Sequence, residues 1–454
     1  MKDTILTKII KDKYEWITKL KKLYPLKSFN HKVNPSTRSF YHAISDNNKI
    51  EFILECKKAS PSKGIICSDF DPINIASIYR HYASVISVLT EEKYFKGNLN
   101  FLRQVSQSIN QPILCKDFII DPWQIYLARL YQADAILLML SILNDDNYCK
   151  LVTVAHHLNM GILTEVINNK ERNRAISLKA KVIGINNRDL RYLSINLNRI
   201  NVLSPKLPAD INIISESGIT ICNKVRKISN YTNGFLIGST LMAETNLITS
   251  LFKILLGANK VCGLTRTIDA RASIESGAIY GGLIFIPGTP RVINENIAQN
   301  IISSAALHYV GVFSNNSIKK IVNITTKLAI SILQLHGNEN QNYIDILNQY
   351  LVSDGYLWKV FDIFNIILPI NNLSKIDRYV LDNGGGSGKS FNWLLLNEIK
   401  LDNIMLAGGL TTANCIAATR LGCAGIDFNS KLEIEPGIKD HKKISTVFDT
   451  LRSY

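Results

Sequence analysis

The stretch Glu51–Gly64, EFILECKKASPSKG, joins a short apolar run to a dense group of polar side chains. Its residues Phe52–Leu54 are typical of a buried strand. Glu55 and Lys57 follow at once, and lone charges are costly to bury. A strand that ends in charged residues and continues into a Ser/Pro/Gly loop is how a parallel barrel presents catalytic groups. The alternative is a solvated strand end, which we disfavour because the same transition recurs along the chain.

Apolar runs of strand length alternate with helix-length segments eight times between residues 49 and about 240. Such alternation predicts an eight-stranded (β/α)8 barrel. The runs are Ile50–Leu54, Ser84–Leu89, Pro112–Cys115, Ala135–Leu140, Gly161–Leu163, Lys181–Ile185, Ile211–Ile214 and Gly234–Ile237.

Polar residues follow these runs repeatedly. Because the carboxyl ends of all barrel strands meet at one rim, we expect these side chains to form a catalytic site there. They are Glu55 and Lys57, then Lys116-Asp117-Phe118, Glu165, Asn186-Asn187-Arg188-Asp189, Glu216-Ser217-Gly218 and Gly238-Ser239.

A second series of eight runs begins after the apolar segment Leu251–Leu256. We therefore predict an α/β chain of two tandem (β/α)8 barrels, residues 1–256 and 257–454. The runs are Lys260–Leu264, Ile279–Ile286, Tyr309–Phe313, Ser331–Leu335, Tyr356–Phe361, Tyr379–Leu381, Ile404–Ala407 and Gly425–Phe428. Polar groups at their ends are Cys262, Arg291, His336, Asp382, Gly408-Gly409 and Asn429-Ser430.

Glycine-containing turns follow the seventh and eighth runs in both halves: SESGI (215–219), LIGS (236–239), LAGGL (406–410) and DFNS (427–430). Barrels bind phosphate at this place, because glycine lets backbone N–H groups approach it. One such turn is weak evidence, but four in matched positions predict two phosphate sites. The segment NGGGSGKS (383–390) is not a nucleotide-binding P-loop, which requires glycine where Asn383 stands. We interpret it as a glycine lid beside Asp382.

Composition narrows the function further. The 454 residues are 46% hydrophobic, and no apolar run approaches the ~18–20 residues that span a bilayer. The N-terminal segment predicts a basic amphipathic helix, which could lie on a membrane but is expected to pack over a barrel mouth. Eight cysteines without metal spacing indicate reduced thiols and a cytoplasmic protein. The net charge of +15 favours anionic partners, and a small phosphorylated substrate would be enough to explain it.

Longer motifs carry a family resemblance. ILECKKASPSKG, LCKDFIIDPWQIYLAR, LTEV, IGINNRDL and ISESGI closely resemble indole-3-glycerol-phosphate synthase. KVCGLTR, VGVF, LQLHG, LDNGGGSGKSFNW and LAGGL resemble phosphoribosylanthranilate isomerase. The resemblance covers nearly the whole chain and implies a fused bifunctional enzyme of tryptophan biosynthesis. The resemblance implies that the substrates are phosphorylated derivatives of anthranilate. It implies no metal ion and no other cofactor.

For the first barrel, the resemblance implies ring closure of a carboxyphenylamino-deoxyribulose phosphate with loss of CO2 and water. Lys116 matches the general acid, Glu165 matches one acid/base group, and Glu55 and Lys57 complete the charged network. Asn186 and Arg188 match residues that hold the anthranilate part, and Phe118 is a further substrate-binding residue. Ser60, Gly218, Gly238 and Ser239 match the phosphate site, and Ser217 lies beside it.

For the second barrel, the resemblance implies an Amadori rearrangement of an aldosylamine to a ketosamine. Asp382 matches the acid that opens the furanose ring, and Cys262 matches the base at C2. Alternatively, Cys262 could be a small buried core residue, as most lone cysteines are. Its position beside Gly263 and ahead of Arg266 favours the functional interpretation. The matching binding residues are Arg291 at the carboxylate, and Gly386, Gly409, Asn429 and Ser430 at the phosphate.

Two competing hypotheses remain open. The segment after Asp382 is one residue short for the family, Asn392 replaces an acidic residue, and Phe285–Arg291 differs, so the isomerase could be weakened. The second competing hypothesis is a barrel that binds nucleic acid. Against it, the lysines are dispersed along the sequence and no RNA- or DNA-binding motif is visible. We expect no nucleic-acid or membrane partner, and a monomer.

Overall fold

The computed structural model describes residues 4–45, 49–244, 246–351, 355–363, 373–384, 392–396 and 399–453. The chain divides into two compact units. The first holds residues 1–220 and 224–251, and the second holds residues 221–223 and 252–453. Apart from residues 221–223, the chain passes from the first unit to the second between Leu251 and Phe252. The boundary predicted from the sequence lies between residues 256 and 257.

Eight parallel strands close the first unit into a barrel, as the alternating runs predict. Around the barrel their order is β1-β10-β9-β8-β7-β6-β5-β4, which follows the sequence except for the two short strands β2 and β3. The barrel strands are β1 (Glu51–Cys56), β4 (Val85–Leu89), β5 (Ile113–Lys116), β6 (Ala135–Met139), β7 (Gly161–Val166), β8 (Val182–Asn186), β9 (Asn212–Glu216) and β10 (Gly234–Ile237).

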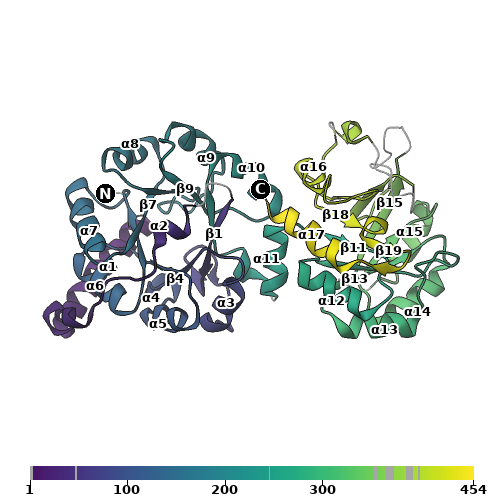
Figure 1. Ribbon diagram of the computed structural model, residues 1–454, viewed down its shortest axis with the longest axis horizontal. Helices are drawn as coiled ribbons and strands as arrows, with labels where there is room; N and C mark the ends of the chain where they lie inside the picture. Colours follow the sequence, from purple (N-terminus) through teal and green to yellow (C-terminus); the bar gives the residue numbers. More distant parts are fainter. Residues whose placement is uncertain are drawn as a thin grey trace. The chain divides into compact units, whose positions relative to one another are not determined.

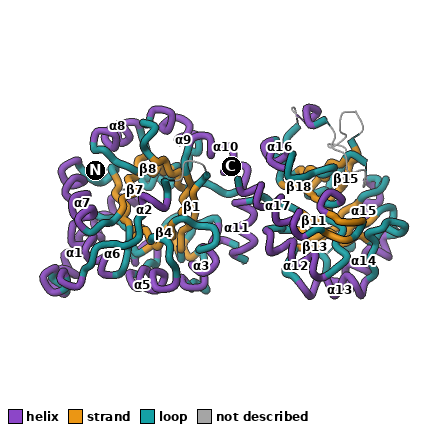
Figure 2. Tube along the Cα trace, in the orientation of Figure 1, coloured by secondary structure: helices purple, strands orange, loops and turns teal. Residues whose placement is uncertain are grey.

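Helices surround these strands (Figures 1 and 2). Since both faces of each strand are covered, the strands are apolar almost throughout. The helices are α3 (Pro72–Tyr79), α4 (Glu92–Phe95), α5 (Leu99–Ser108), α6 (Pro122–Leu130), α7 (Asp145–His157), α8 (Asn169–Ser177), α9 (Asn198–Leu203), α10 (Cys222–Ile228) and α11 (Leu247–Leu255). Strands β2 (Ala59–Ser60) and β3 (Gly64–Ile65) form a small hairpin in the loop after β1.

Two N-terminal helices, α1 and α2 (Phe40–Ala43), pack on the first barrel, whose apolar cluster includes Leu6 and Ile9 of α1 and Phe40 of α2. Helix α1 (Ile5–Leu23) buries Leu6, Ile9 and Ile17, as its amphipathic pattern predicts. Lys13 departs from that pattern: it is buried, and its Nζ lies 2.7 Å from Asp117, the residue after β5. This pair places α1 at the carboxyl end of β5. No helix in the described parts of the chain is both long and apolar enough to cross a bilayer.

The second unit is also a closed barrel of eight parallel strands, in the order β11 to β18. The strands are β11 (Lys260–Val261), β12 (Tyr280–Ile284), β13 (His308–Phe313), β14 (Ile332–Leu335), β15 (Tyr356–Asp362), β16 (Arg378–Asp382), β17 (Ile404–Leu406) and β18 (Gly425–Phe428). The helices are α12 (Thr267–Ser276), α13 (Glu295–Ser304), α14 (Ile318–Leu328), α15 (Gln341–Asn348), α16 (Cys415–Arg420) and α17 (His441–Arg452). A hairpin of β19 (Glu433–Glu435) and β20 (Ile438–Lys439) follows β18.

The strand period of two decides which side chains face the barrel interior. In β7, Leu163 belongs to the interior apolar cluster, so Glu165 points inward one step nearer the carboxyl end. In β16, Val380 belongs to the interior cluster of the second barrel, and Asp382 follows it by the same step. The apolar layers therefore form a floor, above which the inward polar residues of different strands meet.

Candidate active sites

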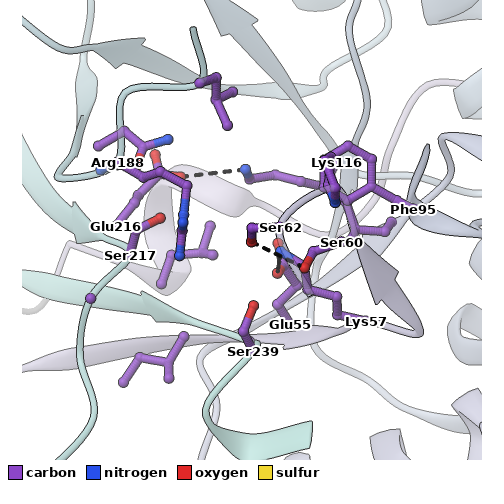
Figure 3. Close-up of a pocket in the computed structure, with 18 of the residues that line it drawn as sticks. Glu55, Lys57, Ser60, Ser62, Phe95, Lys116, Arg188, Glu216, Ser217 and Ser239 are labelled. Carbon is purple, nitrogen blue, oxygen red and sulfur yellow. Dashed lines mark hydrogen bonds and ion pairs between the residues drawn. The ribbon is translucent and has the colours of Figure 1, made fainter. Parts of the chain in front are cut away.

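Lys116, Glu165 and Glu216 meet inside the first barrel, at the carboxyl ends of β5, β7 and β9. Nζ of Lys116 lies 3.4 Å from Oε2 of Glu216 and 4.0 Å from Oε2 of Glu165. Both carboxylates are buried, with 2% of each side chain exposed. Figure 3 shows the Lys116 side chain directed across the cavity toward Glu216.

Burial and these neighbours shift the pKa values of all three groups. Burial opposes the charge of Lys116, but the carboxylates of Glu216, Glu55 and Glu165 outweigh it and raise the pKa of Lys116. Burial, with the nearby charge of Glu216, raises the pKa of Glu165 to about 8. Burial also raises the pKa of Glu216. At neutral pH the site therefore holds a charged lysine beside a carboxylic acid that keeps its proton.

Glu55 and Lys57 form a second charged pair at the end of β1, where Oε1 of Glu55 lies 3.2 Å from Nζ of Lys57. Glycines make room for the carboxylates. A Cβ at Gly238 would lie 2.3 Å from Oε1 of Glu55, and one at Gly184 would lie 2.0 Å from Oε1 of Glu216. Gly238, which the sequence predicts as a phosphate residue, is thus also required by the position of Glu55.

Asn186 and Arg188, predicted to hold the anthranilate, line the same cavity, as does Phe118, predicted to bind substrate. Asn186 accepts the backbone N–H of Arg188 at 2.9 Å, and Arg188 donates to the carbonyl of Leu193 at 2.9 Å. Phe118 packs against Phe95, with ring centroids 6.2 Å apart. Burial lowers the pKa of Arg188, which leaves a partly desolvated guanidinium facing the cavity.

The predicted phosphate residues lie on the loops after β1, β9 and β10 (Figure 3). Ser60 belongs to the β2–β3 hairpin. Ser217 and Gly218 both have positive φ, +67° and +83°. The left-handed region is unfavourable for serine, and the side-chain amide of Asn187 braces the turn by donating to the carbonyl of Ser217 at 3.2 Å. Gly218 supplies the conformation without such strain.

One cavity collects every site residue predicted for the first barrel. These are Glu55, Lys57, Ser60, Lys116, Phe118, Glu165, Asn186, Arg188, Ser217, Gly218, Gly238 and Ser239. From the sequence, Glu216 was placed only among the polar residues that follow the strands and was given no role in catalysis or binding. In the structure it ends β9, beyond the predicted run Ile211–Ile214, and its carboxylate lies nearer to Lys116 than that of Glu165. No signal in the sequence distinguishes it from the other strand-end polar residues.

A second cavity, in the second barrel, collects Cys262, Arg291, Asp382, Gly409, Asn429 and Ser430. The predicted phosphate residue Gly386, and most of the predicted glycine lid, lie outside the described residues. Cys262 directly follows β11. Its backbone N–H donates a hydrogen bond to the carbonyl of Phe428 on β18 at 2.7 Å, which extends the pairing of the two strands. The predicted acid and base of this half thus lie on one cavity.

Arg291 is already engaged by a carboxylate. Its guanidinium donates to both oxygens of Glu433, at 2.9 and 2.7 Å. Glu433 also accepts from Nζ of Lys439 at 2.8 Å. The predicted role of Arg291, gripping the anthranilate carboxylate, would therefore use a guanidinium that is oriented by this ion pair.

Two titratable residues near the predicted acid Asp382 were given no role from the sequence: His336, which lines the cavity, and Asp362. His336, Asp362 and Asp382 end or follow β14, β15 and β16, and one side-chain N or O atom of each lies within 4.8 Å of the others. This set could hold a metal ion by its geometry, although the sequence spacing predicts none. Burial, followed by the charge of Asp362, raises the pKa of Asp382. Burial lowers the pKa of His336.

The fold and the two cavities define a chain of two (β/α)8 enzymes, each with acids and bases at the carboxyl ends of its strands. Comparison with known families agrees. The family model described as indole-3-glycerol phosphate synthase matches residues 6–253. The model described as N-(5'-phosphoribosyl)anthranilate isomerase matches residues 259–450.

Full-length relatives combine both parts. The tryptophan biosynthesis protein TrpCF of Salmonella typhi is 55% identical over 99% of this chain and 100% of its own length. TrpCF of Buchnera aphidicola subsp. Diuraphis noxia is 54% identical over 100% of both chains. A solved phosphoribosyl anthranilate isomerase from Thermotoga maritima is 26% identical, covers 44% of this chain and 100% of that one, and has a TM-score of 0.38. The chain belongs to the bifunctional indole-3-glycerol phosphate synthase/phosphoribosylanthranilate isomerase family of tryptophan biosynthesis.

Proposed function

We propose that the second barrel makes the compound that the first barrel consumes, with the residues of the two cavities in separate roles. The isomerase converts N-(5-phosphoribosyl)anthranilate to 1-(2-carboxyphenylamino)-1-deoxyribulose 5-phosphate. The synthase closes its ring, releases CO2 and water, and yields indole-3-glycerol phosphate. The position of the Lys116 ammonium between Glu165 and Glu216 carries the proposal for the synthase.

In the synthase, Lys116 donates a proton to the ketone oxygen while the aromatic carbon that bears the carboxylate attacks the ketone carbon. Loss of CO2 returns the bonding electrons to the ring system. Departure of the new hydroxyl as water then requires an acid, and removal of the remaining proton requires a base. Glu165 supports the acid role because it keeps its proton at neutral pH. The Glu55–Lys57 pair supports the base role because it faces the same cavity.

In the isomerase, Asp382 gives its proton to the furanose oxygen, and the C1–O bond breaks to form an iminium ion. Cys262, as a thiolate, removes the C2 proton and leaves an enolamine, which tautomerises to the ketone. The raised pKa of Asp382 supports its role as the acid. Gly409, Asn429 and Ser430 line the end of the cavity where we place the phosphate.

The proposal is tested by supplying N-(5-phosphoribosyl)anthranilate to the whole protein and following indole-3-glycerol phosphate. We expect both steps to proceed without an added enzyme. Lys116→Ala should accumulate the deoxyribulose phosphate intermediate, whereas Cys262→Ala should leave the substrate unchanged but still convert added intermediate. A folded variant that loses both activities would contradict the separate assignment of the two sites. An intact synthase with little isomerase would instead support the weakened-isomerase hypothesis.

We also infer a cytoplasmic monomer whose partners are these small phosphorylated compounds. The surplus of positive charge supports attraction of anionic substrates. Binding to nucleic acid would instead depend steeply on salt, because it releases counterions. Retention on a DNA column at about 0.15 M salt would contradict this inference, and gel filtration tests the monomer.

A further inference from the structure

Lys260 is a fully buried lysine in the interior of the second barrel. It lies on β11, and none of its side chain is exposed. Its Nζ lies 2.7 Å from Oδ2 of Asp427 on β18 and 3.0 Å from Oε1 of Gln334 on β14. Burying an ammonium is costly and is tolerated only when partners compensate it. A lysine that is kept in this position, at the base of a catalytic cavity, calls for a functional explanation.

The Lys260 side chain lies beside the Cys262 thiol. The two residues are two positions apart at the end of one strand, so both face the interior. Gly282 on the neighbouring strand β12 shows how close they are. A Cβ on this glycine would lie 2.5 Å from Sγ of Cys262 and 3.0 Å from Cε of Lys260. The sulfur and the lysine stem therefore share the space that the missing side chain leaves.

Cys262 needs such a neighbour, because only 5% of it is exposed. Burial raises the pKa of its thiol, and Lys260 opposes this more strongly than any other charge. Asp427 acts in the opposite direction, and Lys439 lowers the pKa of Cys262 to a smaller extent. The positive charge of Arg291 also interacts with Cys262, but Glu433 pairs with both Arg291 and Lys439. Their positive charge is therefore partly neutralised.

We propose that Lys260 is a positioning residue of the isomerase: its ammonium, held by Asp427 and Gln334, supplies the positive charge beside which the Cys262 thiolate forms. The inference rests on the proposed role of Cys262 as the base. It makes a distinctive prediction, because the two members of one ion pair should have opposite effects. Removing Lys260 should disfavour the thiolate, whereas removing the charge of Asp427 should favour it. If the ion pair were purely structural, removing either member would not shift the Cys262 thiol–thiolate equilibrium in opposite directions.

The experiment uses the full-length variants Lys260→Met and Asp427→Asn. Alkylation of Cys262 by iodoacetamide is followed against pH, and the Cys262 peptide is quantified by mass spectrometry because the chain has eight cysteines. We expect Lys260→Met to raise the alkylation midpoint by at least about one pH unit, which is about tenfold less thiolate at a fixed lower pH. The acidic limb of isomerase kcat/KM should move with it. Asp427→Asn should lower the midpoint.

Lys359→Met is the matched control. Lys359 is another buried lysine of this barrel, and its Nζ lies 3.0 Å from Oε2 of Glu339. It lies between the interior residues Trp358 and Val360 on β15, so its side chain points to the opposite face. Its loss should cost stability without moving the Cys262 midpoint. An equal rise in this control would show that the Lys260 effect is not specific, and would overturn the proposal.

An unchanged midpoint in Lys260→Met, or a rise in Asp427→Asn, would also overturn it. If Lys260→Met does not fold, as judged by circular dichroism, the Asp427→Asn midpoint decides alone: a value below wild type supports the proposal, and any other value rejects it. Cys262→Ser separates the proposed function from this inference. Full isomerase activity in that variant would refute Cys262 as the base, whereas the alkylation midpoints would still report on Lys260.

Discussion

The carboxylate of Glu165 lies 4.0 Å from the ammonium of Lys116, too far for a close ion pair. Glu216 is nearer to the same ammonium, at 3.4 Å. The closer carboxylate compensates the lysine, and its charge adds to burial in raising the pKa of Glu165 to about 8. Two proton donors of different acidity therefore face one cavity, which suits a reaction that protonates first a ketone oxygen and later a leaving hydroxyl.

The first prediction concerns the pH dependence of the synthase. Above a pH of about 8, Glu165 loses its proton, so turnover should fall as pH rises through that value. Lys116 remains charged, because its pKa is raised. The measurement is synthase kcat with purified deoxyribulose phosphate intermediate between about pH 6 and about pH 10. Glu165→Gln should lose about 100-fold or more in kcat and leave the isomerase intact. A level profile across this range would contradict the assignment.

The second prediction concerns two glycines, one in each barrel. Gly184→Ala would place a methyl group 2.0 Å from Oε1 of Glu216, and Gly282→Ala would place one 2.5 Å from Sγ of Cys262. Each clash should displace a cavity residue and lower kcat of its own barrel by about tenfold or more, as small misplacements do. Steady-state assays of both activities on each variant provide the control. Loss of the same activity in both variants would contradict the two-site arrangement.

The third prediction concerns Asp362. Burial and the charge of Asp362 raise the pKa of Asp382, so Asp362→Asn should lower it. Asp382 would then lose its proton at a lower pH, and the basic limb of isomerase kcat/KM should move down by roughly half a pH unit or more. Asp345→Asn is the control, because Asp345 pairs with Lys375 on the exposed surface. Equal profiles for Asp362→Asn and the wild type would argue against the effect.

The fourth prediction concerns the proposed domain boundary. A fragment of residues 1–256 contains all eight strands of the first barrel and α11. Because each barrel closes on itself, we expect this fragment to fold and to retain synthase turnover within about threefold of the full chain. Circular dichroism and the synthase assay check this. A soluble but inactive fragment would indicate that the second unit contributes to the synthase site, and a fragment that fails to fold would argue against the boundary.

The sequence determined the strands and most of the chemistry. Apolar runs, their spacing and the polar residues that follow them are local features, so Lys116 and Glu165 could be assigned to strand ends in advance. The same logic placed Cys262 late in the first run of the second half and Asp382 directly after the sixth. Glycine turns indicated which end of each barrel should hold phosphate. These inferences needed only the strand period and the parallel direction of the strands.

Tertiary structure alone decided which of these groups touch. Lys260 and Asp427 are 167 residues apart, and Arg291 and Glu433 are 142 residues apart, yet both pairs form close ion pairs. The sequence identified Glu216 only as a strand-end residue, and barrel closure placed it nearer to Lys116 than Glu165 is. Closure brings distant strands together, and burial there shifts the pKa values that give each group its role. Neither effect is encoded in any short segment.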